Sequence, residues 1–155
     1  MKLELKHLAP YLPYGLNIEN PKDYRFDGMS TDAKTLKLDG IQGEFIKFDN
    51  ISCFYPIQAF KPILRPLSDL TKRIAIGDDS FIPIYRILRT CDLEKHNIEW
   101  DISKRGIIEI WAETKCCERT ISESLTLGDY LKLFEWHFDV FGLIENNLAI
   151  DINTI

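Results

Sequence analysis

The sequence has no long hydrophobic run and no apolar leader at its N-terminus. No stretch approaches the roughly 20 apolar residues that a membrane-spanning helix needs, and residues 1–10 carry a charge at every second or third position. Of the 155 residues, 45% are hydrophobic and 28% are charged, which is typical of one globular domain. We therefore expect a cytoplasmic protein that has no membrane partner.

The motifs of common cofactor sites and catalytic centres are also missing. There is no glycine-rich phosphate loop of the G-x-x-x-x-G-K-[ST] or G-x-G-x-x-G type, and no serine lies in a G-x-S-x-G turn. The cysteines form no C-x-x-C pair, and the adjacent Cys116 and Cys117 cannot easily hold one zinc ion together; the other two are Cys53 and Cys91. We expect reduced thiols, no cofactor, no metal site and no enzymatic activity.

Charge is the one uneven feature of the composition. The net charge is −5, which disfavours a protein that coats nucleic acid by neutralising phosphates. Residues 61–91 nevertheless hold a basic cluster, and the aromatic residues Phe60 and Tyr85 lie nearby in sequence; the cluster is Lys61, Arg65, Lys72, Arg73, Arg86 and Arg89. Cations beside aromatic rings suit single-stranded nucleic acid, which gives one hypothesis for function. The alternative is a solvated fringe on a pair of strands.

Alternating apolar residues and turn residues predict a series of β-hairpins. Residues 35–48 form the first, with Gly40 and Gly43 bracketing its turn, and residues 53–57 extend it; the polar stretch 20–35 before it is typical of a surface loop. Further along the chain we expect an extended segment with a short turn at 61–72. It is followed by a hairpin of 73–76 with 81–88, in which Pro83 lies at an edge or a bulge. Residues 98–102 and 107–111 are expected to form a further strand pair.

The last forty residues change to a helical period. Apolar side chains recur at Leu127, Leu131, Phe134, Phe138 and Phe141, which predicts one long amphipathic helix that Thr126 or Ser124 caps. Residues 148–152 alternate as a terminal strand does. The fold class we expect is α+β, with antiparallel hairpins packed on this helix. We expect one domain over 1–155. Its parts are an N-terminal segment and hairpin at 1–60, a β unit at 61–112, and a C-terminal helix with its strand at 123–155.

Trp136 carries the sharpest hypothesis about binding. At about 100° per residue it lies opposite the apolar stripe of that helix, so it faces water between Asp129 and Lys132 if the stripe is buried. An indole on this face is either covered by the N-terminal segment or left exposed as a contact for another protein. The second alternative is considered because aromatic anchors dominate binding energy. We take Trp136, Asp129 and Lys132 as candidate partner-binding residues.

A catalytic alternative centres on His137. It lies near Asp139, and a histidine with a carboxylate can act as a general base, which would suit a cryptic hydrolase. Residues two apart on a helix do not face each other, however, so the pair is poorly arranged. Neither His7 nor His96 has an acidic or thiol neighbour at metal-ligand spacing.

Two segments, KPILRPLSDLTK at 61–72 and EWHFDVFGLIENNLAIDINT at 135–154, resemble small uncharacterised proteins of bacteriophages and prophages. The resemblance implies expression in the cytoplasm of a bacterial host and carries no catalytic residue with it. Small acidic proteins of that kind often act by binding a host protein. The expected function is therefore non-enzymatic protein binding. We expect this binding to inhibit a host defence protein or a host nucleic-acid-processing protein.

Overall fold

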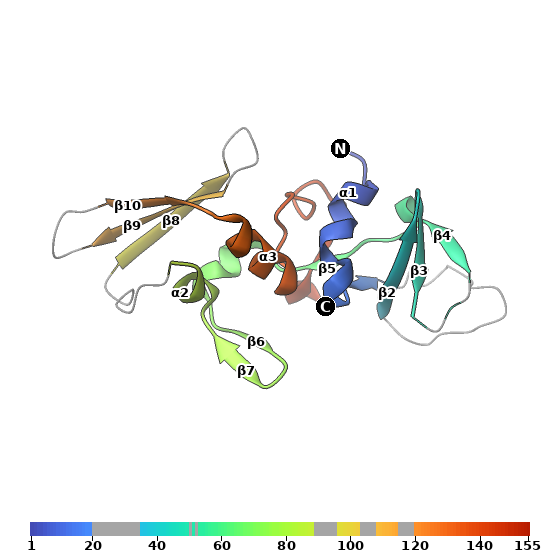
Figure 1. Ribbon diagram of the computed structural model, residues 1–155, viewed down its shortest axis with the longest axis horizontal. Helices are drawn as coiled ribbons and strands as arrows, with labels where there is room; N and C mark the ends of the chain where they lie inside the picture. The colour runs from blue at the N-terminus through green and yellow to red at the C-terminus, as the bar shows by residue number, and fades with distance from the viewer. Residues whose placement is uncertain (20–34, 50, 52, 89–95, 103–107, 115–119) are drawn as a thin grey trace. The chain divides into compact units, whose positions relative to one another are not determined.

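The computed structural model describes residues 1–19, 35–49, 51, 53–88, 96–102, 108–114 and 120–155. The chain divides into two compact units (Figure 1). Unit 1 comprises Met1–Pro66 and Leu133–Ile155, and unit 2 comprises Leu67–Lys132. The single domain expected over 1–155 stays a prediction. The surface loop expected at 20–35 lies almost wholly outside the described residues.

Unit 1 begins with two short helices that are anchored by a buried tyrosine. Helix α1 (Leu5–Leu8) runs directly into the 3-10 helix η1 (Ala9–Tyr14). Tyr11 in η1 is fully buried, and its hydroxyl donates a hydrogen bond to the carbonyl oxygen of Phe138 at 2.6 Å. One side chain thus joins the start of the chain to its last quarter.

A four-stranded antiparallel sheet follows in the order β1-β2-β3-β4. Its strands are β1 (Asn17–Glu19), β2 (Thr35–Gln42), β3 (Phe45–Phe48) and β4 (Phe54–Pro56). Alternate residues of each strand are buried, as expected for a sheet with one face on a core. The predicted hairpin at 35–48 is confirmed, and β4 lies within its predicted extension at 53–57. Gly40, expected at the turn, instead lies within β2 opposite Lys47.

The core of unit 1 is mostly aliphatic, with buried Leu and Ile side chains around two groups of aromatic rings. Phe48, Tyr55 and Phe60 form one cluster, with the Phe48 and Phe60 centroids 4.9 Å apart and their rings edge to face. Tyr11 and Phe134 meet edge to face at 5.1 Å in a second group. Such offset and edge-to-face pairs are the arrangements that the ring quadrupole favours. The 3-10 helix η2 (Ile57–Ala59) links β4 to Phe60.

The C-terminal end of the chain returns to unit 1 as a strand. Strand β11 (Ile150–Asp151) pairs with β5 (Ile63–Leu64), and the 3-10 helix η5 (Ile152–Thr154) follows it. The predicted terminal strand is therefore confirmed, but its pairing with β5 is parallel rather than antiparallel. Parallel pairing requires a long connection between the two strands, which the rest of the chain provides here.

Unit 2 contains a second hairpin and a short helix. The 3-10 helix η3 (Leu67–Thr71) precedes strands β6 (Ile74–Ile76) and β7 (Asp79–Phe81). The hairpin expected here forms, but its second strand begins at Asp79, so the connection is Gly77-Asp78 and not the four residues 77–80. The prediction that 81–88 continues as a strand is wrong, because helix α2 (Pro83–Leu88) begins there. Pro83 is its first residue and not an edge-strand residue. Proline suits this position since the amide it lacks would have no partner in the first turn.

Three longer strands complete the β structure of unit 2. They are β8 (His96–Ile102), β9 (Ile108–Thr114) and β10 (Thr120–Ser124), in the order β10-β9-β8. Ile98 pairs with Ala112 and Ile102 with Ile108, which confirms the predicted pairing of these two strands. Strand β10 has no counterpart in the sequence-based predictions.

Helix α3 (Leu127–Glu135) is shorter than expected. Thr126 caps its start as predicted, because the Asp129 N–H donates to the Thr126 hydroxyl and the Thr126 N–H donates to the Asp129 carboxylate. The helix ends at Glu135, and His137, two residues further on, has a positive φ of 58°. The N–H of Phe138 then donates to the carbonyl of Leu133 at 2.8 Å, and both side chains are fully buried.

The α+β class is thus confirmed, while the single long C-terminal helix is wrong. Phe138 belongs to no helix. It forms an isolated parallel bridge with Arg65, and the N–H of Arg65 donates to the carbonyl of His137 at 2.8 Å. Tertiary pairing with the 61–66 segment therefore outcompetes continuation of the helix, although the apolar period continues to Phe141.

Candidate binding surface

The β2–β3 turn lies beside Phe45 and Phe54, the most exposed aromatic side chains in the described part of unit 1. Gly43 and Glu44 connect the strands, and Gln42 pairs with Phe45 across the turn. Gly43 has a φ of +60°, which a glycine at the first central position of a tight hairpin turn adopts without steric cost. This turn fixes which residues of β3 face the core.

The register places two phenylalanines on the outer face of the sheet. Ile46 on β3 is fully buried, so its neighbour Phe45 points outward and is 49% exposed. On β4, Tyr55 pairs with Ile46 and is buried, and Phe54 next to it is 42% exposed. Phe45 and Phe54 therefore lie on adjacent strands and share one face. Lys47, directly opposite Phe54, lies on that face too.

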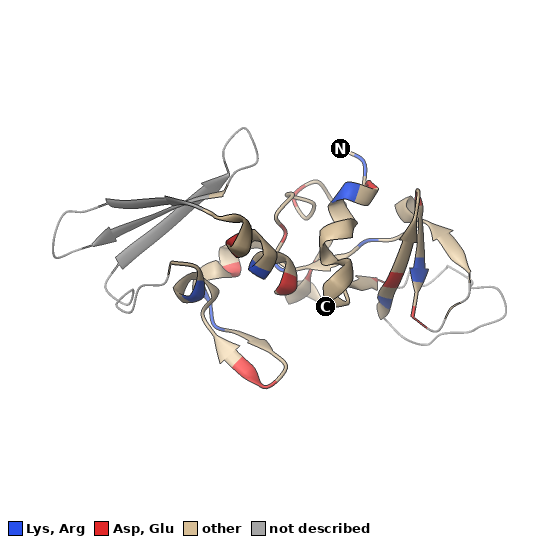
Figure 2. Ribbon diagram, in the orientation of Figure 1, with Lys and Arg blue, Asp and Glu red and all other residues tan. Residues whose placement is uncertain are grey.

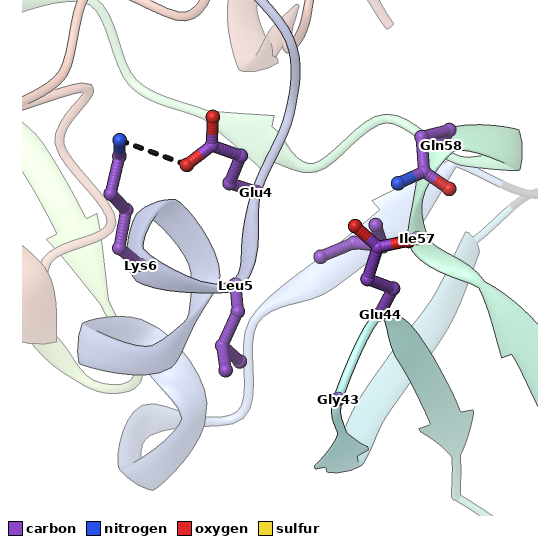
Figure 3. A pocket seen from close by; sticks show the side chains of 7 residues that line it. All are labelled: Glu4, Leu5, Lys6, Gly43, Glu44, Ile57 and Gln58. Atoms are coloured by element: carbon purple, nitrogen blue, oxygen red, sulfur yellow. Dashed lines mark ion pairs between the residues drawn. The ribbon is translucent and has the colours of Figure 1, made fainter.

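Two adjoining hollows flank this face. The first has a volume of about 410 Å³ and lies between α1 and the β2–β3 turn; Figure 3 shows Glu4, Leu5 and Lys6 on one side of it and Glu44, Ile57 and Gln58 on the other. The second, of about 560 Å³, is lined by Gln42, Gly43, Glu44, Phe45 and Phe54. Gly43 and Glu44 belong to both. We call the residues of the two hollows the turn surface.

The charges around the turn surface form short local pairs. The Lys6 ammonium lies 2.9 Å from the Glu4 carboxylate and lowers the pKa of that carboxyl group. Lys47 donates to Asp39 at 3.0 Å. Glu44 has only a long contact of 3.8 Å with Lys2, and its side chain is 77% exposed.

Trp136 does not face water. It is 7% exposed, whereas Leu127 and Leu131 are 75% and 47% exposed. As predicted, Trp136 lies on the opposite side of α3 from Leu127 and Leu131. The side that is buried, however, is the one that carries Asp129, Leu133 and Trp136. A carboxylate on the buried face is tolerated because its Oδ2 accepts from the N–H and the hydroxyl of Thr126, and the Lys132 ammonium lies 3.7 Å from its Oδ1.

The proposed docking site around Trp136 is therefore corrected. Asp129 is buried and serves as a capping residue. Lys132 donates to the carbonyl oxygen of Arg86 at 3.3 Å and lies 3.7 Å from Asp129. These three residues do not form an exposed patch. The structure favours the reading in which the indole is covered.

The six cations expected to form a basic cluster are divided between the two units. Lys61 and Arg65 belong to unit 1, while Lys72, Arg73 and Arg86 belong to unit 2, and Arg89 lies outside the described residues. Figure 2 shows Lys and Arg on α1, α2 and α3 and on the sheet that contains β2 and β3.

The described members of this set have partners close by. Lys61 donates to Asn147 at 2.8 Å, and Lys72 donates to the buried Asp69 at 2.7 Å. Arg86 donates to Asp79 at 2.7 Å and covers the Phe81 ring at 3.7 Å. Cations engaged in this way are less available to phosphates, so this arrangement does not favour the nucleic-acid hypothesis.

His137 and Asp139, the pair behind the hydrolase hypothesis, contact different backbone groups. The Nε2–H of His137 donates to the carbonyl of Tyr14 at 3.2 Å. The Asp139 carboxylate accepts from the N–H groups of Leu143 and Ile144, each at 2.8 Å, and burial raises the pKa of this carboxyl group. Asp139 thus holds the turn that directly follows it, whereas His137 joins its segment to the end of η1.

Two histidines of unit 1 give a prediction for pH. His7 is buried, and its Nδ1 accepts a hydrogen bond from the Glu4 N–H at 3.0 Å, which requires the neutral ring. Burial, with Lys6 nearby, lowers the pKa of His7, and burial, with Arg65 nearby, lowers the pKa of His137. At these two histidines the unfolded chain therefore binds more protons than the folded chain as the pH falls through 6.5.

We expect the free energy of unfolding to fall as the pH is lowered from 7.5 to 5.5, by at most about 1.4 kcal/mol per pH unit for each histidine. Urea denaturation at several pH values measures this slope. The double variant His7→Gln, His137→Asn should flatten it, and an unchanged slope in that variant would contradict the assignment. Asparagine is chosen because it tolerates the positive φ at position 137.

Within the described ranges, no group of three His, Cys, Asp or Glu side chains is placed to hold a metal ion. No helix in the described part of the chain is both long and apolar enough to cross a membrane. Cys53 is free and exposed, whereas Cys91, Cys116 and Cys117 lie outside the described residues.

Comparison with known protein families, curated proteins and solved structures finds no match to this chain. The resemblance to phage proteins therefore stays a prediction. The residues that sequence reasoning missed are Phe45 and Phe54, which it treated only as parts of a hairpin.

Proposed function

We propose that this chain is a non-enzymatic protein that binds a partner protein through the turn surface. The observation that carries the proposal is the distribution of exposed apolar side chains. In the described part of unit 1, the large apolar side chains that are well exposed away from the chain ends are Leu5, Phe45 and Phe54. All three line the two hollows. Exposed aromatics beside a hollow are typical of binding surfaces.

The class of partner follows from the resemblance of residues 61–72 and 135–154 to phage and prophage proteins. That resemblance supports a bacterial host protein, with a defence factor or a nucleic-acid-processing factor as the target of inhibition. The turn surface replaces Trp136 as the contact region in this proposal. A polar rim of Glu4, Lys6 and Gln58 around the apolar residues suits an interface that forms between folded proteins.

The double variant Phe45→Ser, Phe54→Ser tests the proposal. Because each ring is about half buried, we expect the two substitutions together to lower the free energy of unfolding by about 2 kcal/mol, which urea denaturation measures and which leaves the fold intact. A partner captured from a bacterial lysate and then purified should bind this variant at least about tenfold more weakly by isothermal titration calorimetry, as loss of aromatic anchors predicts.

The matched control is Leu127→Ser with Leu131→Ser, which removes two exposed apolar side chains from α3 instead. This control should bind the purified partner as the unmodified chain does. The proposal is wrong if the phenylalanine variant keeps full affinity, or if the leucine variant loses it.

A further inference from the structure

Glu44 lies at the centre of the turn surface. It is the charged residue that lines both hollows, and the backbone places it between the Gly43 turn and the aromatic Phe45. In Figure 3 its carboxylate stands beside Ile57 and Gln58, across the hollow from α1. Any segment that lies along both hollows must therefore pass this carboxylate.

Glu44 is also the least neutralised charge of this surface. The ion pair of Lys6 with Glu4 has a length of 2.9 Å, and the nearby pair of Lys47 with Asp39 has a length of 3.0 Å. The Lys2 ammonium, in contrast, lies 3.8 Å from the Glu44 carboxylate. An exposed ion pair of that length contributes little, so Lys2 is readily displaced by another cation. The chain as a whole carries a net charge of −5. Charge complementarity therefore favours a positively charged group at this point.

Apolar contact area lies directly beside this carboxylate. Phe45 follows Glu44 in the chain, and Phe54 lies on the neighbouring strand of the same face. Volumes of about 410 and 560 Å³ are large enough for individual side chains of a partner.

We infer that the turn surface takes a segment of the partner protein in which a lysine or arginine side chain stands next to an aromatic or aliphatic one. The cation pairs with Glu44, and its apolar neighbour packs on Phe45 and Phe54. This inference rests on the proposed function and adds the chemistry of the segment that is bound. A strongly basic segment without apolar side chains should bind weakly, because it cannot pack on Phe45 and Phe54. An acidic segment should bind weakly because Glu44 repels it.

Short blocked peptides test the inference without knowledge of the partner. The probe is acetyl-Arg-Trp-Arg-Trp-Arg-amide, and its two controls replace every arginine by glutamate or every tryptophan by serine. Backbone amide shifts of the full-length chain are followed by NMR during titration to millimolar concentration. The basic aromatic peptide should shift residues 42–45 and 54, and both controls should bind several-fold more weakly.

The variant Glu44→Gln should weaken binding of the basic aromatic peptide by about three- to fivefold, as loss of an exposed ion pair predicts. The matched control Glu19→Gln removes an exposed carboxylate on β1 that lines neither hollow, and it should change nothing. Equal binding of the acidic and basic peptides, no effect of Glu44→Gln, or no shifts with the basic peptide would overturn the inference.

The design separates this inference from the proposal on which it rests. If binding of the purified partner needs Phe45 and Phe54 but not Glu44, the protein-binding function stands and the cationic segment is wrong. If a ten-residue oligothymidylate shifts residues 42–45 and 54 while the peptides do not, a nucleic acid occupies the surface and both are wrong.

Discussion

Replacement of Tyr11 by alanine should lower the free energy of unfolding by about 3–5 kcal/mol. The ring is fully buried and packs edge to face on Phe134, and its hydroxyl donates to the Phe138 carbonyl at 2.6 Å. The substitution removes both contacts and leaves a cavity where the N-terminal helices meet the 138–141 segment. Urea denaturation followed by tryptophan fluorescence measures the loss.

The variant Tyr11→Phe separates the hydroxyl from the ring. It keeps the packing and removes the donor to Phe138, so we expect a loss of about 1 kcal/mol. If Tyr11→Ala unfolds no more easily than Tyr11→Phe, the ring does not anchor the N-terminal segment and this description of unit 1 is wrong.

Replacement of Trp136 by alanine should also destabilise the protein, by about 3–5 kcal/mol, because the indole is only 7% exposed. A loss of this size should lower the melting temperature by roughly 10 °C for a chain of this length. The matched variant Leu131→Ala removes an exposed side chain of α3 and should change the melting temperature little. Differential scanning calorimetry compares the two.

The same variant distinguishes the two interpretations of Trp136 that the sequence left open. A buried indole predicts loss of stability, whereas a docking residue predicts unchanged stability with loss of a partner. If Trp136→Ala melts like the unmodified chain but fails to bind the purified partner, the exposed-indole hypothesis is restored and the turn surface is not the main contact.

The local structure was predictable where turn residues and apolar alternation agree. The β2–β3 hairpin follows from Gly43 at its turn, and the β6–β7 hairpin follows from Gly77, since both glycines have positive φ angles. The strand predicted beyond Phe81 failed because a proline was interpreted as an edge residue. Pro83 equally suits the first turn of a helix, and the sequence alone does not choose between the two.

Helix α3 shows what local pattern cannot supply. Apolar residues continue in helical spacing beyond Glu135, yet His137 takes a left-handed conformation and Phe138 pairs with Arg65. That pairing joins residues far apart in the chain, so no local signal announces it. The buried face was also misassigned, since a charged Asp129 argues for exposure unless its capping bonds to Thr126 are known.

The sequence of β3 already indicated that an apolar side chain of the candidate site is exposed. Strand β3 has the sequence FIKF, with apolar residues at Phe45, Ile46 and Phe48. Because side chains of a strand alternate, three apolar residues in four positions cannot all face one core. At least one must face outward, and the structure shows that it is Phe45. Only the register with β4 places Phe54 beside it.

The central claim is that the turn surface is where the partner binds. Hydrogen–deuterium exchange of the full-length chain, alone and saturated with the purified partner, tests it most directly. We predict that protection on binding is centred on residues 42–45 and 54–58, with no change at the β6–β7 hairpin. Protection at Leu127 and Leu131 of α3, with none at the β2–β3 turn, would contradict the account.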